Sequence, residues 1–130
     1  MRGGSDSGEE LRPVPASTDR LSSMRKYVES RPDEAFPRYG LAMEYAKAGL
    51  LEDADAQFQE LRHRHPEYVA TYYHHGMLFL RMGRKEDARL TWEEGIRVSS
   101  AKGDLHTRGE IEAALLELGA ASDPGAAGSR

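Results

Sequence analysis

Apolar residues recur three and four positions apart along the middle of the chain, the spacing that places them on one face of an α-helix. Gly, Pro or Asp interrupts this pattern at regular intervals, and helix-favouring Ala, Leu, Glu, Arg and Lys fill the segments between. β-branched residues are scarce, and no segment alternates apolar and polar residues over five or more positions. The pattern predicts an all-α protein with helices near residues 20–30, 35–48, 51–64, 67–82, 85–100 and 104–118.

A sequence repeat organises these helices. Residue 35 corresponds to residue 69, and shifting the chain by this offset aligns similar residues throughout two consecutive units. The same shift aligns Pro66 with Pro32, which indicates the second half of an earlier unit. The aligned pairs are Tyr39 with Tyr73, Ala42 with Gly76, Met43 with Met77, Tyr45 with Phe79, Gly49 with Gly83, Ala54 with Ala88, Phe58 with Trp92 and Glu60 with Glu94.

These residues resemble the tetratricopeptide repeat (TPR), a helix-turn-helix unit with the same period, and the chain as a whole resembles a small bacterial-type TPR protein. The resemblance covers the chain from Arg20 to Gly119. It implies a right-handed α-solenoid of antiparallel helix pairs. We expect a half-unit at 19–34, full units at 35–68 and 69–102, a capping helix at 103–119, and disordered tails at 1–18 and 120–130.

Each aligned position has a physical role in this fold. Gly49 and Gly83 end the first helix of their units in a left-handed conformation, and small residues such as Ala42 and Gly76 let the paired helices approach closely. Large aromatic residues fill the space between helices, namely Tyr45, Phe58, Phe79 and Trp92.

Three positions depart from the family pattern. Arg38 replaces a large apolar residue, although its stem can cover part of the same surface, and His75 replaces a leucine. Ser100 replaces the proline expected to match Pro66, so the second unit runs on. The last helix carries Leu105, Ile111, Leu115 and Leu118 and is expected to cap the apolar end of the array.

The resemblance implies that the first helix of each unit lines a concave groove. Its register predicts the groove residues Phe36, Tyr39, Gly40, Met43 and Lys47, then Ala70, Tyr73, His74, Met77 and Arg81, and finally Thr107, Arg108 and Ile111. Tyrosine and methionine provide adaptable apolar contact area, and basic side chains can pair with carboxylates. We therefore expect a non-enzymatic adaptor that binds a peptide or helix of a partner protein, with Lys47, Arg81 and Arg108 selecting acidic groups.

The adjacent His74 and His75 do not form a shared metal site, because neighbouring helical residues differ by about 100° in direction. We expect His74 in the groove and His75 buried, neutral and bonded to a backbone carbonyl. The HRHP segment fails the same geometric test. No phosphate loop or nucleophile motif is present, and Glu44 lacks a partner at acid-base spacing, so we expect no enzyme activity, no metal and no cofactor.

Composition narrows the partners further. The formal net charge of −4 gives no general attraction to nucleic acid or to an anionic membrane, and the absence of Cys excludes disulfides and thiol chemistry. No apolar run approaches the roughly 20 residues needed to span a bilayer, so we expect a cytoplasmic protein. The alternative function is a structural subunit that docks or forms a homodimer through its terminal helices, using Met24, Tyr27 and Val28 or Leu115 and Leu118.

Overall fold

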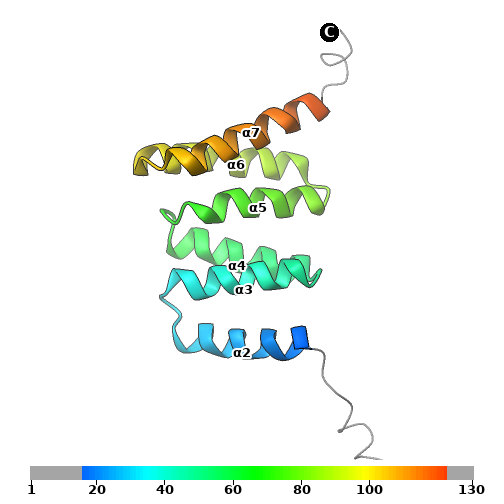
Figure 1. Ribbon diagram of the computed structural model, residues 1–130, viewed down its shortest axis with the longest axis vertical. Helices are drawn as coiled ribbons and strands as arrows, with labels where there is room; N and C mark the ends of the chain where they lie inside the picture. Colours follow the sequence, from blue (N-terminus) through cyan, green and yellow to red (C-terminus); the bar gives the residue numbers. More distant parts are fainter. Residues whose placement is uncertain (1–15, 123–130) are drawn as a thin grey trace, which may run out of the picture.

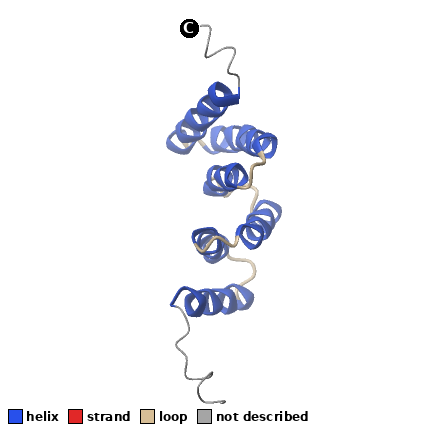
Figure 2. Ribbon diagram, turned by 90° about the vertical axis from the view of Figure 1, so that its right-hand side faces the viewer, coloured by secondary structure: helices blue, strands red, loops and turns tan. Residues whose placement is uncertain are grey.

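The computed structural model describes residues 16–122, with side chains from 19 to 120. This part of the chain is all helical, as predicted, and it contains α2 (Ala16–Ser30), α3 (Ala35–Lys47), α4 (Leu51–Arg64), α5 (Ala70–Arg81), α6 (Lys85–Lys102) and α7 (Leu105–Ser122). The helices lie one above another in chain order (Figure 1), and the chain passes back and forth between two layers (Figure 2). The architecture is the predicted α-solenoid of paired helices.

The predicted helix bounds are close to the observed ones, with differences at three places. α5 begins at Ala70 instead of 67, because the chain turns after Pro66 and the Tyr68 amide donates to the His65 carbonyl at 3.0 Å. α2 begins at Ala16 and α7 continues to Ser122, so both helices extend into the segments predicted as disordered tails. The remaining predicted tail residues lie outside the described part of the chain.

Glycines form the turns inside the two full units, as predicted. Gly49 has φ +83° and Gly83 has φ +78°, a left-handed conformation that costs glycine little. The next amide in each turn bonds back along its helix, from Leu50 to the Tyr45 carbonyl at 2.9 Å and from Arg84 to the Phe79 carbonyl at 2.8 Å. These bonds satisfy carbonyls that a helix end leaves open and fix where the second helix starts.

The close crossing of α5 and α6 depends on Gly76. A Cβ atom at this position would overlap the indole ring of Trp92, which is fully buried. The Trp92 indole N–H donates to the Tyr73 carbonyl at 3.1 Å and so ties the two helices together. In the preceding unit the equivalent positions hold Ala42 and Phe58, and both are fully buried. Alanine is therefore paired with the smaller ring of phenylalanine, and glycine with the larger ring of tryptophan.

The departures from the family pattern make specific contacts. Arg38 is 8% exposed and donates to the Pro32 carbonyl at 3.2 Å, while Tyr72, its equivalent in the next unit, donates to the Pro66 carbonyl at 2.6 Å. The guanidinium of Arg38 also donates to Gln57 at 2.9 Å. Two different side chains therefore tie the first helix of their unit to the preceding turn in the same way.

The register changes at the last helix. As Ser100 suggested, α6 runs on, to Lys102, and it ends at Gly103 with φ +75°. Asp104 then caps α7, accepting from the Thr107 amide at 3.0 Å and from the Thr107 hydroxyl at 2.8 Å. Ile111 of α7 is fully buried. The repeat offset aligns the buried His75 with Gly109, so the burial pattern of α7 is shifted by two positions relative to α5.

This shift makes part of the groove prediction wrong. Ile111 is not a groove residue, because it packs on α6, where a Cβ added at Gly95 would lie 2.8 Å from its Cδ1 atom. Thr107 is occupied by the cap of α7. With the two-position shift, the groove positions of the earlier units correspond to Gly109, Glu110 and Ala113.

The terminal helices also differ from the prediction. Val28 and Leu118 are 4% and 8% exposed, so both are buried within the chain and neither is available for docking. Leu105 is 71% exposed and does not contribute to the cap. No helix in the described segment has the length and apolar character that a membrane span requires.

The fit between Gly76 and Trp92 can be tested by changing the size of each side chain. Gly76→Ala should lower the free energy of unfolding by about 1–3 kcal/mol, because the new methyl group overlaps the indole ring. Gly76→Ala combined with Trp92→Phe recreates the pair found at Ala42 and Phe58 and should recover part of this loss. Urea denaturation followed by circular dichroism measures both effects.

Gly109→Ala is the matched control. Gly109 lies inside α7 with nothing within 4 Å of a Cβ, so alanine should stabilise the protein by up to about 1 kcal/mol. Equal effects of alanine at Gly76 and Gly109 would contradict the close crossing.

Candidate functional site

The predicted groove residues of α3 and α5, with the equivalent positions of α7, form a surface that we call the inner face. Tyr39 lies at the centre of an aromatic group on it, with ring-centroid distances of 5.7 Å to Tyr68, 5.7 Å to His74 and 6.5 Å to Phe36. Tyr73 continues the group, 5.1 Å from His74. Phe36 is 71% exposed, and the other rings are half-buried. The structure thus brings together the predicted aromatic residues of two units.

The methionines extend this surface toward the other end of the helices. Met77 is 39% exposed, and Met43 is half-buried against the core of the first unit. Phe58 and Trp92, by contrast, are fully buried. The aromatic residues of the second helices therefore build the core, while Tyr73 and Met77 stay accessible from solvent.

The predicted basic residues of the inner face are engaged to different degrees. Lys47 is exposed at the end of α3. Arg81 donates to the Ala46 carbonyl at 2.9 Å and so stabilises the end of α3. Arg108 pairs with Glu112 of its own helix at 3.0 Å. Two of the three cations therefore already have partners within the chain.

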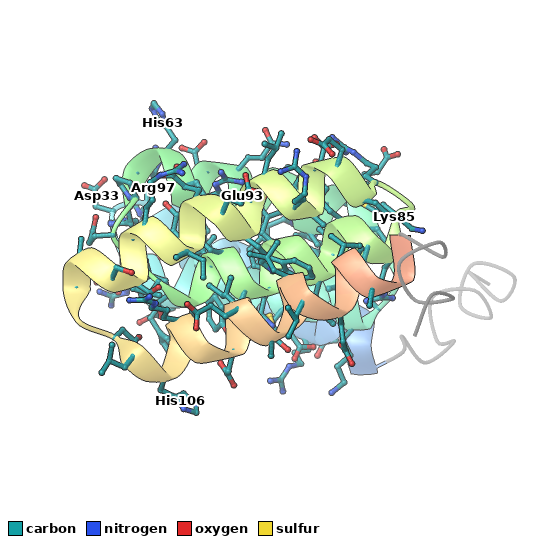
Figure 3. The ribbon with its side chains drawn as sticks, turned by 90° about the horizontal axis from the view of Figure 1, so that it is seen from above. Asp33, His63, Lys85, Glu93, Arg97 and His106 are labelled. Atoms are coloured by element: carbon teal, nitrogen blue, oxygen red, sulfur yellow. The ribbon has the colours of Figure 1, made fainter. Side chains whose placement is uncertain are left out.

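A cavity of about 1140 Å³ opens between α5 and the second half of α7. Its walls include Tyr73, Met77 and Leu80 from α5, Lys85 and Trp92 from α6, and Glu110, Ala113, Ala114, Leu116, Glu117, Leu118 and Ala120 from α7. Figure 3 shows the solenoid from above, with Lys85 beside the C-terminal part of α7. The cavity continues the inner face past the predicted residues Tyr73 and Met77.

Several inner-face residues were not predicted. Tyr68 lies in the turn between α4 and α5, where the repeat offset gives it no aromatic equivalent. Leu80, Glu110 and Glu117 line the cavity between α5 and α7. The spacing of Glu110, Ala113 and Glu117 at i, i+3 and i+7 was the available signal, because it places all three on one side of a helix.

His75 is buried, as predicted, but its hydrogen bonds go to side chains instead of a backbone carbonyl. Its Nε2 lies 2.7 Å from Asp55 and its Nδ1 lies 3.3 Å from the guanidinium of Arg62. The ring is stacked between Phe58 and Phe79, with centroid distances of 5.3 and 4.3 Å. Because arginine can only donate, Nδ1 must accept, and Nε2 carries the proton that is donated to Asp55.

Burial lowers the pKa of His75 to about 4, against the opposing effect of the hydrogen bond to Asp55. Arg62 and Arg84 act in the same direction as burial and disfavour a positive charge on the ring. Arg62 also donates to the Thr91 hydroxyl at 3.0 Å, so one network joins α4, α5 and α6. His75 is therefore a neutral structural residue at the joint between the two units.

His74 has a different environment from its neighbour. It is half-buried in the aromatic group of the inner face, and burial lowers the pKa of its imidazole, while the carboxylate of Glu110 opposes this shift. His63 and His106 point to opposite sides of the solenoid (Figure 3). Across the described residues, no group of three or more His, Cys, Asp or Glu side chains is arranged to hold a metal ion.

Comparison with known proteins gives consistent relatives, although the sequence matches no protein-family profile. The TPR repeat-containing protein PA0015 of Pseudomonas aeruginosa is 28% identical over 98 residues, which cover 75% of this chain and 93% of that protein. The crystal structure of a tetratricopeptide repeat domain protein from Salinibacter ruber is 39% identical, with a TM-score of 0.63 over 65% of this chain and 94% of that chain. The solution structure of BPP2914 from Bordetella parapertussis shares the fold at 22% identity, with a TM-score of 0.71 over 86% of this chain and 95% of that chain.

The neutral state of His75 makes stability depend on pH. The unfolded chain binds a proton on this residue below pH 6.5, whereas the folded chain binds it only near pH 4, so the free energy of unfolding should fall as pH decreases between these values. The loss due to His75 reaches about 3 kcal/mol at pH 4. Urea denaturation of the wild type and of His75→Gln at several pH values measures this contribution as the difference between the two slopes.

His106→Gln is the control for this experiment, because it replaces a highly exposed histidine that lies outside the buried network of His75. Long-range proton–nitrogen NMR spectra should show the proton of His75 on Nε2 at neutral pH. A charged imidazole at pH 6, or equal slopes for the wild type and His75→Gln, would contradict the assignment.

Proposed function

Because the chain belongs to the tetratricopeptide repeat family, whose members are typically non-enzymatic interaction modules, we propose that it is an adaptor that binds a peptide or helix of a partner protein on its inner face. The relatives support protein binding as the general activity. The groove as the binding site is the proposal.

The accessibility of Tyr73 and Met77 is the observation that carries the proposal. Both residues are neighbours of the fully buried Trp92 around the same cavity, yet both stay accessible from solvent. Exposed apolar surface of this kind, next to an open cavity, is typical of an interaction site. Tyrosine loses little rotamer freedom on binding, and methionine adapts to different side chains.

The carboxylate considered from the sequence does not favour an enzyme. Glu44, the carboxylate that we considered from the sequence, is paired with Arg20 at 3.4 Å. The side chain of Glu44 is 18% exposed, while that of Arg20 is 64% exposed, so the pair lies at the surface. Acid-base catalysis commonly uses two titratable groups whose environments shift their pKa values in opposite directions. Glu44 is instead paired with an arginine. We therefore propose a binding function without catalysis.

Docking through the terminal helices is the second candidate function. Leu116 of α7 is 78% exposed, Leu105 is 71% exposed, and Tyr27 of α2 is 49% exposed. α2 and α7 lie at the two ends of the solenoid, so each has described helices on one of its sides only (Figure 1). This surface supports self-association or docking on a larger assembly.

Replacing Tyr73 and Met77 together by Ala should weaken binding of the natural partner at least about tenfold, because truncated apolar anchors typically dominate binding energy. The partner is first captured by affinity purification from the native cell and identified by mass spectrometry, and its affinity is then measured by calorimetry. The helical circular dichroism of the variant should equal that of the wild type.

Leu50→Ala combined with Leu90→Ala is the matched control, since both residues are exposed, neither lines the cavity and neither lies on a terminal helix. This variant should bind the partner as the wild type does. Unchanged affinity of the Tyr73→Ala, Met77→Ala protein would refute the inner face as the binding site.

The second candidate has its own test. If α7 mediates self-association, light scattering should show a dimer at high protein concentration, and Leu105→Ser with Leu116→Ser should convert it to a monomer. A wild-type monomer at millimolar concentration would exclude self-association.

A further inference from the structure

We propose that the cavity between α5 and α7 binds a basic amphipathic segment of a partner protein. In this segment a large apolar side chain lies on Tyr73 and Met77, and Lys or Arg side chains pair with Glu110 and Glu117. The inference rests on the proposed function and adds the chemical class of the partner. It reverses the charge that the strict repeat register predicts for this end of the groove.

The reversal follows from the shifted register of α7. At the strict offset Arg108 would face the groove, but the shift of two positions brings Glu110 to that place. Glu110 lines the cavity, and Arg108 is paired with Glu112. The charge next to Tyr73 and Met77 is therefore negative.

The apolar part of the cavity defines the first feature of the partner. Met77 and Leu80 of α5 and Leu116 of α7 line the cavity, and Ala113 and Ala114 of α7 contribute only small side chains to its wall. Small residues on α7 leave room close to its backbone, so a bulky side chain or one face of a helix can enter.

Two carboxylates define the second feature. Glu110 and Glu117 are seven residues apart on α7, which is two turns of helix and a separation of about 10 Å along its axis. Cationic side chains at the same separation on a partner, two turns apart on a helix, would meet both. Apolar residues between them would face the cavity.

The carboxylates are available for such pairing. Among the described residues no cation pairs with Glu117, and the contact of Glu110 is with the exposed imidazole of His106 at 3.5 Å, a pair that is ionic only when the imidazole is protonated. Glu110 also acts on the aromatic group of the inner face, since its charge raises the pKa values of Tyr39 and His74, alongside the effect of burial on Tyr39 and against it on His74. Glu110 also lines the cavity, so its charge lies beside the apolar surface of Tyr73 and Met77.

The cations of this region are placed differently. Arg81 donates to the Ala46 carbonyl at the end of α3. Lys85 lines the cavity beside the C-terminal part of α7 (Figure 3). The cavity wall thus carries two carboxylates and one ammonium group, so its net charge complements a partner segment with more basic than acidic residues.

A phage-displayed library of random dodecapeptides tests the partner class. Peptides selected on the wild type should be enriched in Lys and Arg around large apolar residues. Selection on Glu110→Lys, Glu117→Lys should lose this preference and favour Asp and Glu. A selected peptide should bind that variant at least tenfold more weakly in fluorescence anisotropy, and its affinity for the wild type should fall as salt concentration rises.

Glu29→Lys with Glu52→Lys is the matched control, because it changes the net charge equally at two exposed residues outside the cavity. It should keep the basic preference. Glu110→Gln with Glu117→Gln removes the charges with little change of shape and should weaken the same peptide by a smaller factor. This second variant decides the outcome if the charge reversal impairs folding.

The outcomes separate the inference from the proposed function. Peptides that need Tyr73 and Met77 but show no excess of basic residues would overturn the inference and leave the inner-face function standing. Failure to select any peptide dependent on Tyr73 and Met77 would overturn both. Light scattering that shows a dimer dissociated by Glu110→Lys, Glu117→Lys would assign the cavity to a second copy of the chain and overturn the partner class.

Discussion

The close approach of paired helices at a glycine or alanine is the contact on which the rest of the structure depends. Trp92 fits over α5 only because Gly76 has no side chain, and its indole N–H is satisfied by the Tyr73 carbonyl. Ala42 and Phe58 are the corresponding residues one unit earlier. The large rings of the second helices are buried in these crossings. The tyrosines and methionines of the first helices lie on the inner face instead, where they stay partly accessible from solvent.

The joint between the two units is polar, in contrast to these crossings. His75 replaces an apolar residue, and its neutral ring bridges Asp55 and Arg62 while it stacks between Phe58 and Phe79. Such a network fixes the orientation of one unit on the next only while every member keeps its partner. The inner face spans this joint, so the relative position of Tyr39 and His74, which lie in different units, depends on it.

The repeat made most of the fold predictable, because equivalent positions in successive units perform the same packing task. Gly49 and Gly83 could be assigned to left-handed turns, and Phe58 and Trp92 to the core, from their aligned positions in the repeat. The partners of His75 could not be predicted, since Asp55 is brought to it only by the packing of α4 on α5. The inner-face role of Glu110 was missed because the repeat offset changes at Gly103, where α6 overruns the unit. The repeat offset predicted which residues of α3 and α5 share one surface. The residues of α7 on that surface can be identified only with the shifted register.

The register of α7 is the central structural claim, because it decides whether the end of the inner face is basic or acidic. The chain contains no Cys, so a single Cys at position 111 or 113 can be labelled without interference. The account predicts that the thiol of Ala113→Cys reacts with a maleimide as a free thiol does, while that of Ile111→Cys, buried against α6, reacts only as fast as the protein unfolds. The strict repeat register aligns position 111 with the exposed Met77 and position 113 with the buried Phe79, so it predicts the opposite order. A thiol at 111 that reacts as fast as the thiol at 113 in the folded protein, or faster, would contradict the account.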